Sequence, residues 1–203
     1  MTHQRSTRGT GLLEPWLARR RHAQAQRVIA QRSRPVQSIL DIGCGTAPVF
    51  LRTLAVPHRY GLDKLAPRSY EDHGITVMPW DAAHDLCLPF EPERFDVITM
   101  LAVWEHIVTQ RLLPLCCECY RCLKPGGLLI ITTPSPLAQR ILTVMARCGL
   151  VSREEIDEHV SVMNIPHIRS ILQRAGFSGT DAVQGRRFLL HLNQLVTAIK
   201  QPV

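Results

Sequence analysis

One stretch constrains the fold of this chain more than any other: an apolar run that ends in an acid and a glycine turn, Ser38-Ile39-Leu40-Asp41-Ile42-Gly43-Cys44-Gly45-Thr46. Apolar residues then recur at helical spacing, at Val49, Phe50, Leu51 and Leu54. The stretch therefore predicts a buried strand, a tight turn and a helix. Glycines let the backbone turn sharply and let a ligand approach the main chain, and a helix N-terminus carries a partial positive charge. Open α/β sheets bind nucleotide-like ligands in such a crevice, at the carboxyl end of a strand.

The residues around the turn distinguish between nucleotide-like ligands. The dinucleotide fingerprint requires a third glycine, and Pro48 stands in its place. Asp41, just before the turn, would repel a pyrophosphate, but it suits a ligand that has a cationic amino group and no phosphate. S-adenosylmethionine (SAM), which has an amino-acid end and a sulfonium, meets both conditions.

A second acid stands where a nucleoside ligand would need one. Asp63 ends a strand predicted over His58–Leu62, about 20 residues after the glycine turn, where an acid accepts hydrogen bonds from both ribose hydroxyls. Taken alone, Asp63 would be interpreted as a helix cap or a turn acid. Because it follows a strand–glycine turn–helix unit, the ribose role is favoured.

A third acid follows the next predicted strand, Ile75–Met78. In this position Asp81 would accept a hydrogen bond from the exocyclic amine of adenine. Met78, Trp80 or Ala82 would then pack on the adenine face. The alternative is a solvent-exposed turn acid with no ligand.

The rest of the chain alternates between strand and helix patterns. Further strands are predicted over Val36–Ile42, Phe95–Met100 and Leu128–Thr133, with two final strands or extended segments at Phe177–Val183 and Leu189–Ile199. Helices are predicted over Leu12–Arg32, Thr46–Leu54, Leu112–Leu123, Leu137–Leu150 and Ile165–Ala175. This alternation predicts an α/β fold with a parallel, doubly wound sheet. We expect the first helix to lie over the sheet edge or across the site as a lid.

Positive charge is concentrated at the start of the chain, which divides it into an arm at 1–35 and a domain at 36–203. The arm holds eight arginines and one acid, Glu14, and so accounts for the whole formal net charge of +7. It would be a solvated helix face, an organelle transit peptide, or a contact for an anionic substrate, nucleic acid or membrane surface. The neutral remainder is not a basic nucleic-acid binder.

Four of the seven cysteines lie within residues 116–122. The spacing of Cys116, Cys119 and Cys122 resembles a ligand set, but one helix cannot wrap its own side chains around a tetrahedral ion, so no metal is expected. Reduced thiols predict a reducing, cytoplasmic compartment. No apolar run reaches the roughly 20 residues of a membrane span, and no signal peptide is recognised.

In this order and spacing, the motifs over 36–135 resemble those of class I SAM-dependent methyltransferases, nearest to the ubiquinone and menaquinone biosynthesis branch. They are Leu40-Asp41-Ile42-Gly43-Cys44-Gly45-Thr46, Gly61-Leu62-Asp63, Asp81-Ala82, Phe95-Asp96-Val97-Ile98, Glu105-His106-Ile107 and Leu123-Lys124-Pro125-Gly126-Gly127-Leu128. The resemblance implies a Rossmann-like sheet of seven strands, the last antiparallel, with helices on both faces.

The resemblance also implies a SAM site. Asp41 and the backbone of Gly43, Cys44 and Gly45 would hold the methionine end. The ribose would lie at Asp63 and its neighbour Lys64, the adenine amine at Asp81 and Ala82, and Leu101 would touch the adenine face or the methionine end.

The expected reaction is an in-line methyl transfer to an oxygen, carbon or nitrogen of a small molecule. Alignment and exclusion of water would supply most of the catalysis, and a general base is needed only for a nucleophile of high pKa. Candidates for that base are Glu105, His106 and His159.

Three other functions remain open. One is a nucleic-acid methyltransferase that uses the basic arm, although Thr99-Met100-Leu101-Ala102 stands where amino-group methylases carry an Asn/Asp-Pro-Pro-aromatic turn. Another is a partner subunit that binds SAM without turnover, which the intact Asp41 and Asp63 disfavour. The last is a dinucleotide-dependent oxidoreductase, which the missing third glycine disfavours.

Overall fold

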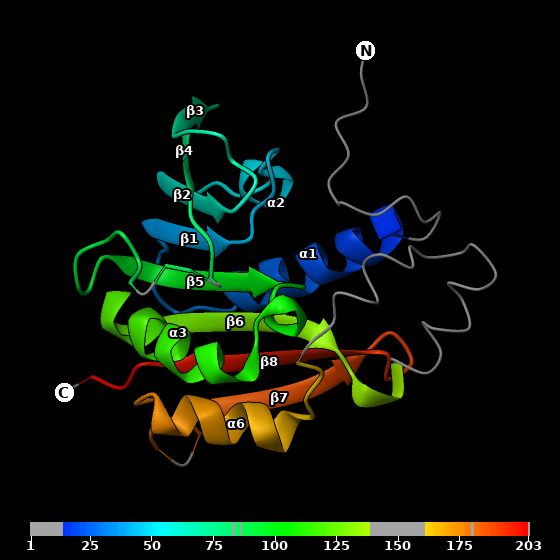
Figure 1. The fold of residues 1–203 in the computed structure, drawn as a ribbon. Helices are drawn as coiled ribbons and strands as arrows, with labels where there is room; N and C mark the ends of the chain where they lie inside the picture. The colour runs from blue at the N-terminus through cyan, green and yellow to red at the C-terminus, as the bar shows by residue number, and fades with distance from the viewer. Residues whose placement is uncertain (1–13, 83, 86, 139–160, 180, 203) are drawn as a thin grey trace.

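The computed structural model describes residues 14–82, 84–85, 87–138, 161–179 and 181–202 (Figure 1). These residues form one sheet of eight strands in the order β3-β4-β2-β1-β5-β6-β8-β7. The strands are β1 (Ser38–Ile42), β2 (His58–Asp63), β3 (Tyr70–Asp72), β4 (Ile75–Pro79), β5 (Phe95–Leu101), β6 (Leu123–Pro134), β7 (Val183–Phe188) and β8 (Asn193–Ile199). The helices are α1 (Glu14–Ala30), α2 (Val49–Arg52), the 3₁₀ turn η1 (Trp104–His106), α3 (Thr109–Cys122) and α6 (Ile165–Arg174).

The strand directions confirm the predicted Rossmann-like fold. β1 pairs in parallel with β2 and β5, and β2–β4 and β5–β6 are also parallel. The final strand, β8, runs antiparallel to both β6 and β7. The short antiparallel edge strand β3 was not predicted, because Tyr-Glu-Asp has too few apolar residues to show a period.

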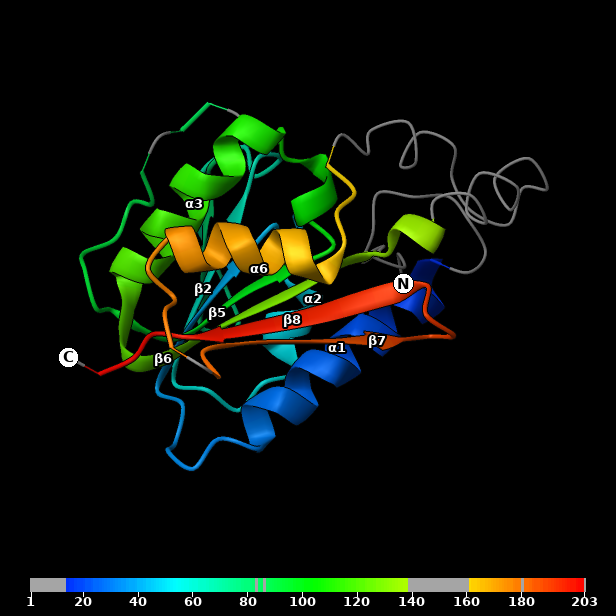
Figure 2. The same cartoon turned by 90° about the horizontal axis from the view of Figure 1, so that it is seen from below.

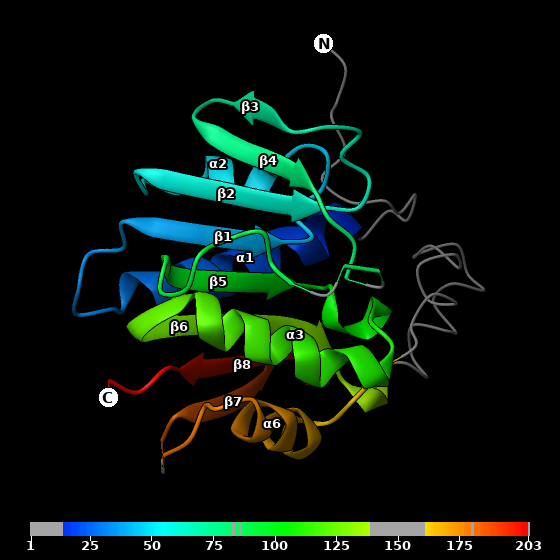
Figure 3. The same cartoon turned by 60° about the vertical axis from the view of Figure 1, so that its left-hand side comes forward.

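Helices cover both faces of the sheet, and the central strands alternate between two cores. Ile39, Val97 and Ile130 pack with α1 and α2 on one face. Their neighbours in sequence, Leu40, Ile98 and Ile131, pack with α3 and α6 on the other face (Figure 2; Figure 3). All five residues of β1 are buried, as expected for a parallel strand between two helix layers.

Three cysteines of α3 belong to the second of these cores. Cys116, Cys119 and Cys122 are fully buried on the side of α3 that faces the sheet. Burial raises the pKa of all three thiols, so they pack as small apolar residues. None of the helices in the described ranges is long and apolar enough to cross a membrane.

The C-terminal strands differ from their prediction. Phe177–Val183 is not a strand, because Gly176 and Gly179 turn the chain there with φ of 112° and 122°, and β7 begins only at Val183. The extended segment predicted over Leu189–Ile199 is β8 preceded by a turn. The helix predicted over Leu137–Leu150 lies outside the described residues except for its start.

The predicted helix over Thr46–Leu54 is shortened to α2, Val49–Arg52. Its first residues are taken up by the loop after the glycine turn, and Pro48 occupies the N-cap position with a non-helical ψ of 64°.

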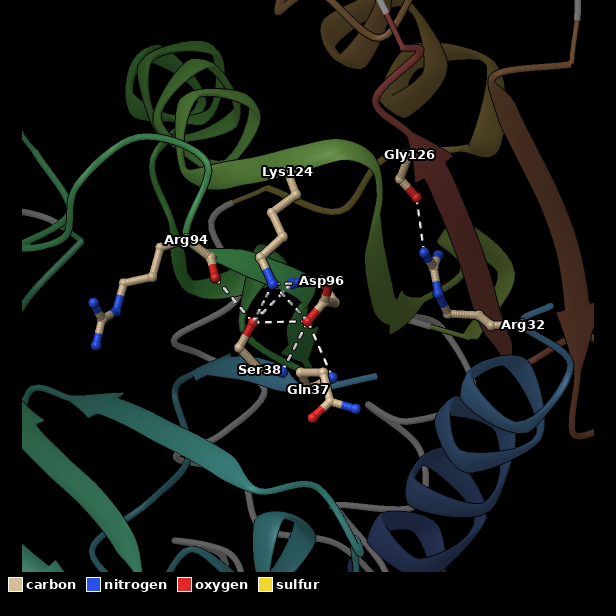
Figure 4. Close-up of polar contacts among 7 residues, drawn as sticks. All are labelled: Arg32, Gln37, Ser38, Arg94, Asp96, Lys124 and Gly126. Carbon is tan, nitrogen blue, oxygen red and sulfur yellow. Dashed lines mark hydrogen bonds and ion pairs between the residues drawn. The ribbon is translucent and has the colours of Figure 1, made fainter. Parts of the chain in front are cut away.

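A polar cluster fastens the starts of three strands at the amino-end edge of the sheet (Figure 4). Asp96 of β5 accepts the backbone N–H groups of Gln37 and Ser38 at 3.0 and 2.9 Å. It also accepts the Ser38 hydroxyl at 2.8 Å and the Lys124 ammonium of β6 at 3.0 Å. Burial raises the pKa of Asp96, but the hydrogen bonds from Lys124 and Ser38 outweigh it and leave that pKa below its usual value.

Candidate active site

The turn after β1 requires glycine. Gly43 and Gly45 have φ of 77° and 74°, in the left-handed region that residues with a side chain rarely adopt. The N–H groups of Gly43 and Cys44 both donate to the carbonyl of Leu62 on β2, at 2.7 and 3.1 Å. A Cβ on Gly43 would collide with the side chain of Val103. The sharp turn therefore lies directly between the ends of β2 and β5.

Asp41 is a buried carboxyl beneath this turn. Its side chain is 3% exposed, and the Thr99 hydroxyl of β5 donates to Oδ1 at 2.6 Å. Burial raises the pKa of Asp41 to about 7, the nearby Asp63 contributes in the same direction, and the bond from Thr99 opposes the rise. A cation placed beside Asp41 would stabilise the ionised form.

Asp63 is held rigidly at the end of β2. It is 5% exposed, and its two oxygens accept the N–H groups of Gly45 at 2.9 Å and Leu65 at 2.8 Å. The carboxylate is therefore oriented by the backbone at the edge of the glycine turn.

A small cavity of about 50 Å³ opens at the glycine turn. Its lining includes Asp41, Gly43, Cys44 and Leu101, four of the residues predicted to bind the cofactor. The other side is formed by helix residues, namely Ala18, Arg21 and His22 of α1 with Val49 and Phe50 of α2.

Arg21 and His22 were not identified as site residues from the sequence. The arginine run before β1 and the expected lid position of its helix were the only signals, and neither indicates which side chains face inward. His22 packs on the Phe50 ring with centroids 5.2 Å apart. Burial, with the charge of Arg21, lowers the pKa of His22 to about 4, so this imidazole is neutral at pH 7.

The remaining predicted cofactor residues lie near the cavity but do not line it. Asp81 follows β4 beside Asp63, since the Trp80 N–H donates to the Asp63 carbonyl at 3.3 Å. Its carboxylate meets His84 Nδ1 at 3.1 Å. Ala82 is half-buried against the core, and Lys64 is exposed.

The predicted general-base residues lie on or beyond η1. Glu105 is buried and His106 half-buried, and the His106 N–H donates to the carbonyl of Val103, the residue that touches Gly43. η1 therefore lies next to the glycine turn. His159 lies outside the described residues.

Comparison with known proteins assigns this arrangement to a family. A sequence profile described as methyltransferase domain matches residues 17–182. A SAM-dependent methyltransferase from Archaeoglobus fulgidus shares the fold with a TM-score of 0.66 at 17% identity, over 90% of this chain and 94% of that one. No curated protein sequence matches the chain.

Two further solved structures share the fold. Phosphoethanolamine N-methyltransferase 2 from Haemonchus contortus, solved with SAM, has a TM-score of 0.63 at 15% identity, over 91% of this chain and 53% of that one. A methyltransferase from Haloferax volcanii, solved with the Trm112 methyltransferase activator, has a TM-score of 0.66 at 13% identity, over 94% of this chain and 98% of that one.

Proposed function

The chain belongs to the methyltransferase domain family, and we propose that it transfers the methyl group of SAM to a small-molecule acceptor. The observation that carries the proposal is the pair of buried carboxyls, Asp41 and Asp63, on neighbouring strand ends beside a glycine turn. SAM has an ammonium for the first and ribose hydroxyls for the second.

The residues present fit SAM. Asp41 is a buried carboxyl whose pKa is raised to about 7, so an ammonium group beside it would compensate a costly buried charge. Arg21, on the opposite wall of the same cavity, would pair with the carboxylate of the methionine end. The cavity of about 50 Å³ is too small for the nucleoside. The nucleoside would lie outside it, along Asp63 and Asp81.

Further contacts follow from this placement. Leu101 lines the cavity and would contact the methionine end, which is one of the two roles expected for it. Lys64 and Ala82, beside Asp63 and Asp81, would border the nucleoside. The segment 1–35 would act as a lid through α1, over the domain at 36–203.

The protein contributes mainly alignment and exclusion of water. When bound, SAM supplies an activated methyl group on its sulfonium. Asp41, Asp63 and the Gly43–Gly45 backbone would fix that methyl group at the mouth of the site, where the acceptor atom approaches in line with the leaving sulfur. His106 on η1 and His159 are the candidate bases for an acceptor that must lose a proton.

Calorimetry with SAM, its demethylated product and NAD tests the proposal. We expect SAM to bind, Asp63→Ala to abolish binding, and Arg21→Gln to weaken it about tenfold through loss of a charge-assisted hydrogen bond. The control is Asp181→Asn, an exposed acid far from the site along the chain, which should bind like the wild type. Binding of NAD without binding of SAM would refute the proposal.

The acceptor class requires a second assay. Incubation of the purified enzyme with isotopically labelled SAM and a cell extract, followed by separation of small molecules from macromolecules, shows where the label goes. We expect it in the small-molecule fraction, and Asp63→Ala should remove it. Label only in RNA or protein would overturn the acceptor assignment while leaving SAM binding intact.

A further inference from the structure

Exposed apolar side chains gather at one edge of the described structure. Six large hydrophobic residues are exposed in the described ranges, and five of them belong to segments at the carboxyl-end edge of the sheet. These five are Trp16, Leu65, Val108, Leu137 and Leu190, with exposed fractions between 42% and 91%. The sixth, Ile199, ends β8 at the opposite edge.

The topology brings these segments together. Leu65, Val108 and Leu137 follow the carboxyl ends of β2, β5 and β6. Because β8 runs the other way, its first residue pairs with the last residue of β6, and the β7–β8 turn that holds Leu190 lies at the same edge.

Helix α1 begins at this edge as well. Its early residues line the cavity beside Gly43, while Arg32, beyond its other end, donates to the Gly126 carbonyl at 2.8 Å at the opposite edge (Figure 4). The start of α1, the end of β6 and the β7–β8 turn accordingly lie on the right-hand side of both Figure 1 and Figure 2.

The β7–β8 turn presents Leu190 in a strained conformation. Leu189, Leu190 and His191 have φ of 51°, 53° and 68°, three successive non-glycine residues in the left-handed region. The turn is fixed by Ser135, whose hydroxyl donates to the His191 carbonyl at 2.7 Å and whose N–H donates to the Leu192 carbonyl at 2.9 Å. A leucine held 91% exposed by such a turn indicates a use for that side chain outside the chain itself.

Cationic side chains flank the apolar ones. Arg19, Arg20 and Arg27 of α1 are exposed, and the Arg20 guanidinium lies 5.3 Å from the centre of the Trp16 ring. The only acid of α1, Glu14, is buried. The exposed residues of α1 therefore include three arginines and no acid.

Strand β7 adds to this positive flank. Arg186 and Arg187 are both exposed, and Arg186 donates to Gln24 of α1 at 2.9 Å. The contact holds β7 against α1, so Arg186 belongs to the same flank, whereas the next residue, Arg187, lies on the other face of the sheet.

We propose that this carboxyl-end edge docks on a lipid bilayer that contains anionic lipids. Leu190 and Trp16 enter the interfacial layer, and Arg19, Arg20 and Arg186 lie against the headgroups. A single-stranded nucleic acid would use the arginines and Trp16, but it would leave the four exposed aliphatic side chains unmatched, whereas a bilayer accommodates both kinds of group. The proposal places the membrane at the mouth of the proposed SAM site, but the docking itself does not require methyl transfer.

Vesicle binding of the full chain tests this inference. We expect the protein to sediment with vesicles of mixed phosphatidylglycerol and phosphatidylcholine but not with vesicles of pure phosphatidylcholine. Added salt should release it from the mixed vesicles. Leu190→Asp and Leu190→Ser should weaken binding about tenfold, since an inserted leucine side chain is lost. The matched control is Ile199→Asp at the opposite edge. Arg20→Ala, which removes one of the flanking charges, should also weaken binding, and its control is Arg174→Ala on α6.

Tryptophan fluorescence provides a local readout. Trp80 and Trp104 are buried and Trp16 is 42% exposed, so a blue shift on vesicle addition should be lost in Trp16→Phe. The proposal would be overturned by absence of binding to anionic vesicles, or by Leu190→Asp and Leu190→Ser variants that both bind as tightly as the wild type. Retention of a single-stranded RNA with no vesicle binding would also overturn it. Calorimetry with SAM separates the outcomes: vesicle binding without SAM binding refutes only the proposed function, and SAM binding without vesicle binding refutes only the docking.

Discussion

Asp41 should make SAM binding depend on pH in a direction that follows from its burial. Without a ligand, the pKa of Asp41 is about 7 because burial disfavours the charged carboxylate. The ammonium of SAM requires the ionised form, so below pH 7 binding must expel a proton. We therefore expect the association constant to fall by about tenfold for each pH unit below 7 and to level off above it.

The neighbouring groups do not obscure this titration. The pKa of His22 is about 4, and burial raises the pKa of the Cys44 thiol well above its usual value. Neither group changes its charge between pH 6 and 8, so a proton released in this range by the cavity lining comes from Asp41.

The stability of the ligand-free protein should change in the opposite sense. Asp41 has a usual pKa of 3.8 and a folded-state pKa of about 7, so between these values the folded chain binds more protons than the unfolded chain. Its contribution to the free energy of unfolding therefore falls as pH rises from about 4 to 7, by an amount on the order of 4 kcal/mol at most. Asp41→Asn should raise the melting temperature at pH 8 and abolish SAM binding.

Calorimetry in two buffers of different ionisation enthalpy counts the released protons directly. We expect about one proton per SAM at pH 6 and none at pH 8, with the same result in the Asp181→Asn control. A SAM affinity that does not vary between pH 5.5 and 8, or an Asp41→Asn variant that is less stable than the wild type at pH 8, would refute the reasoning.

Three other substitutions probe the frame of the site. Thr99→Val removes the bond that lowers the pKa of Asp41, so the midpoint of the pH dependence should rise by about one unit, as measured by the same titration. Gly43→Ala should lower the free energy of unfolding by more than about 2 kcal/mol in urea titrations, because the added methyl meets Val103 in a left-handed turn; equal midpoints would show that the turn relaxes freely. Asp96→Ala leaves the Ser38 backbone N–H and the Lys124 ammonium without their acceptor, and thermal unfolding should show a loss of about 1 to 3 kcal/mol while SAM affinity is kept.

The buried centre of the fold could be predicted from the sequence because its signal is local. β1 and β5 were recognised within a few residues, since strands between two helix layers are largely apolar. Asp41 and Asp63 could be placed at one edge because parallel strands end on the same side. Both indeed border the glycine turn.

The features that could not be predicted from the sequence depend on contacts between segments that are distant along the chain. Arg21 and His22 reach the cavity only because α1 packs across the sheet, and nothing in an arginine-rich helix indicates which residues face inward. The β7–β8 turn was missed because Leu-Leu-His carries none of the glycine or asparagine signals of a left-handed turn. Here the surrounding structure, through Ser135, imposes a conformation that the local sequence does not favour.

The Asp96 cluster indicates which residues can be substituted to change the acceptor of this enzyme. It joins the starts of β1, β5 and β6 at the edge opposite the site, through side chains and backbone far apart in sequence. The alignment of these strands therefore does not depend on the loops at the carboxyl-end edge of the sheet, where the proposed SAM site lies. A library that aims at new acceptors can therefore vary His106 and Val108, which are not buried, while the buried Trp104, Glu105 and Ile107 and the Asp96 cluster are kept. These variants should retain their fold while their substrate choice diverges.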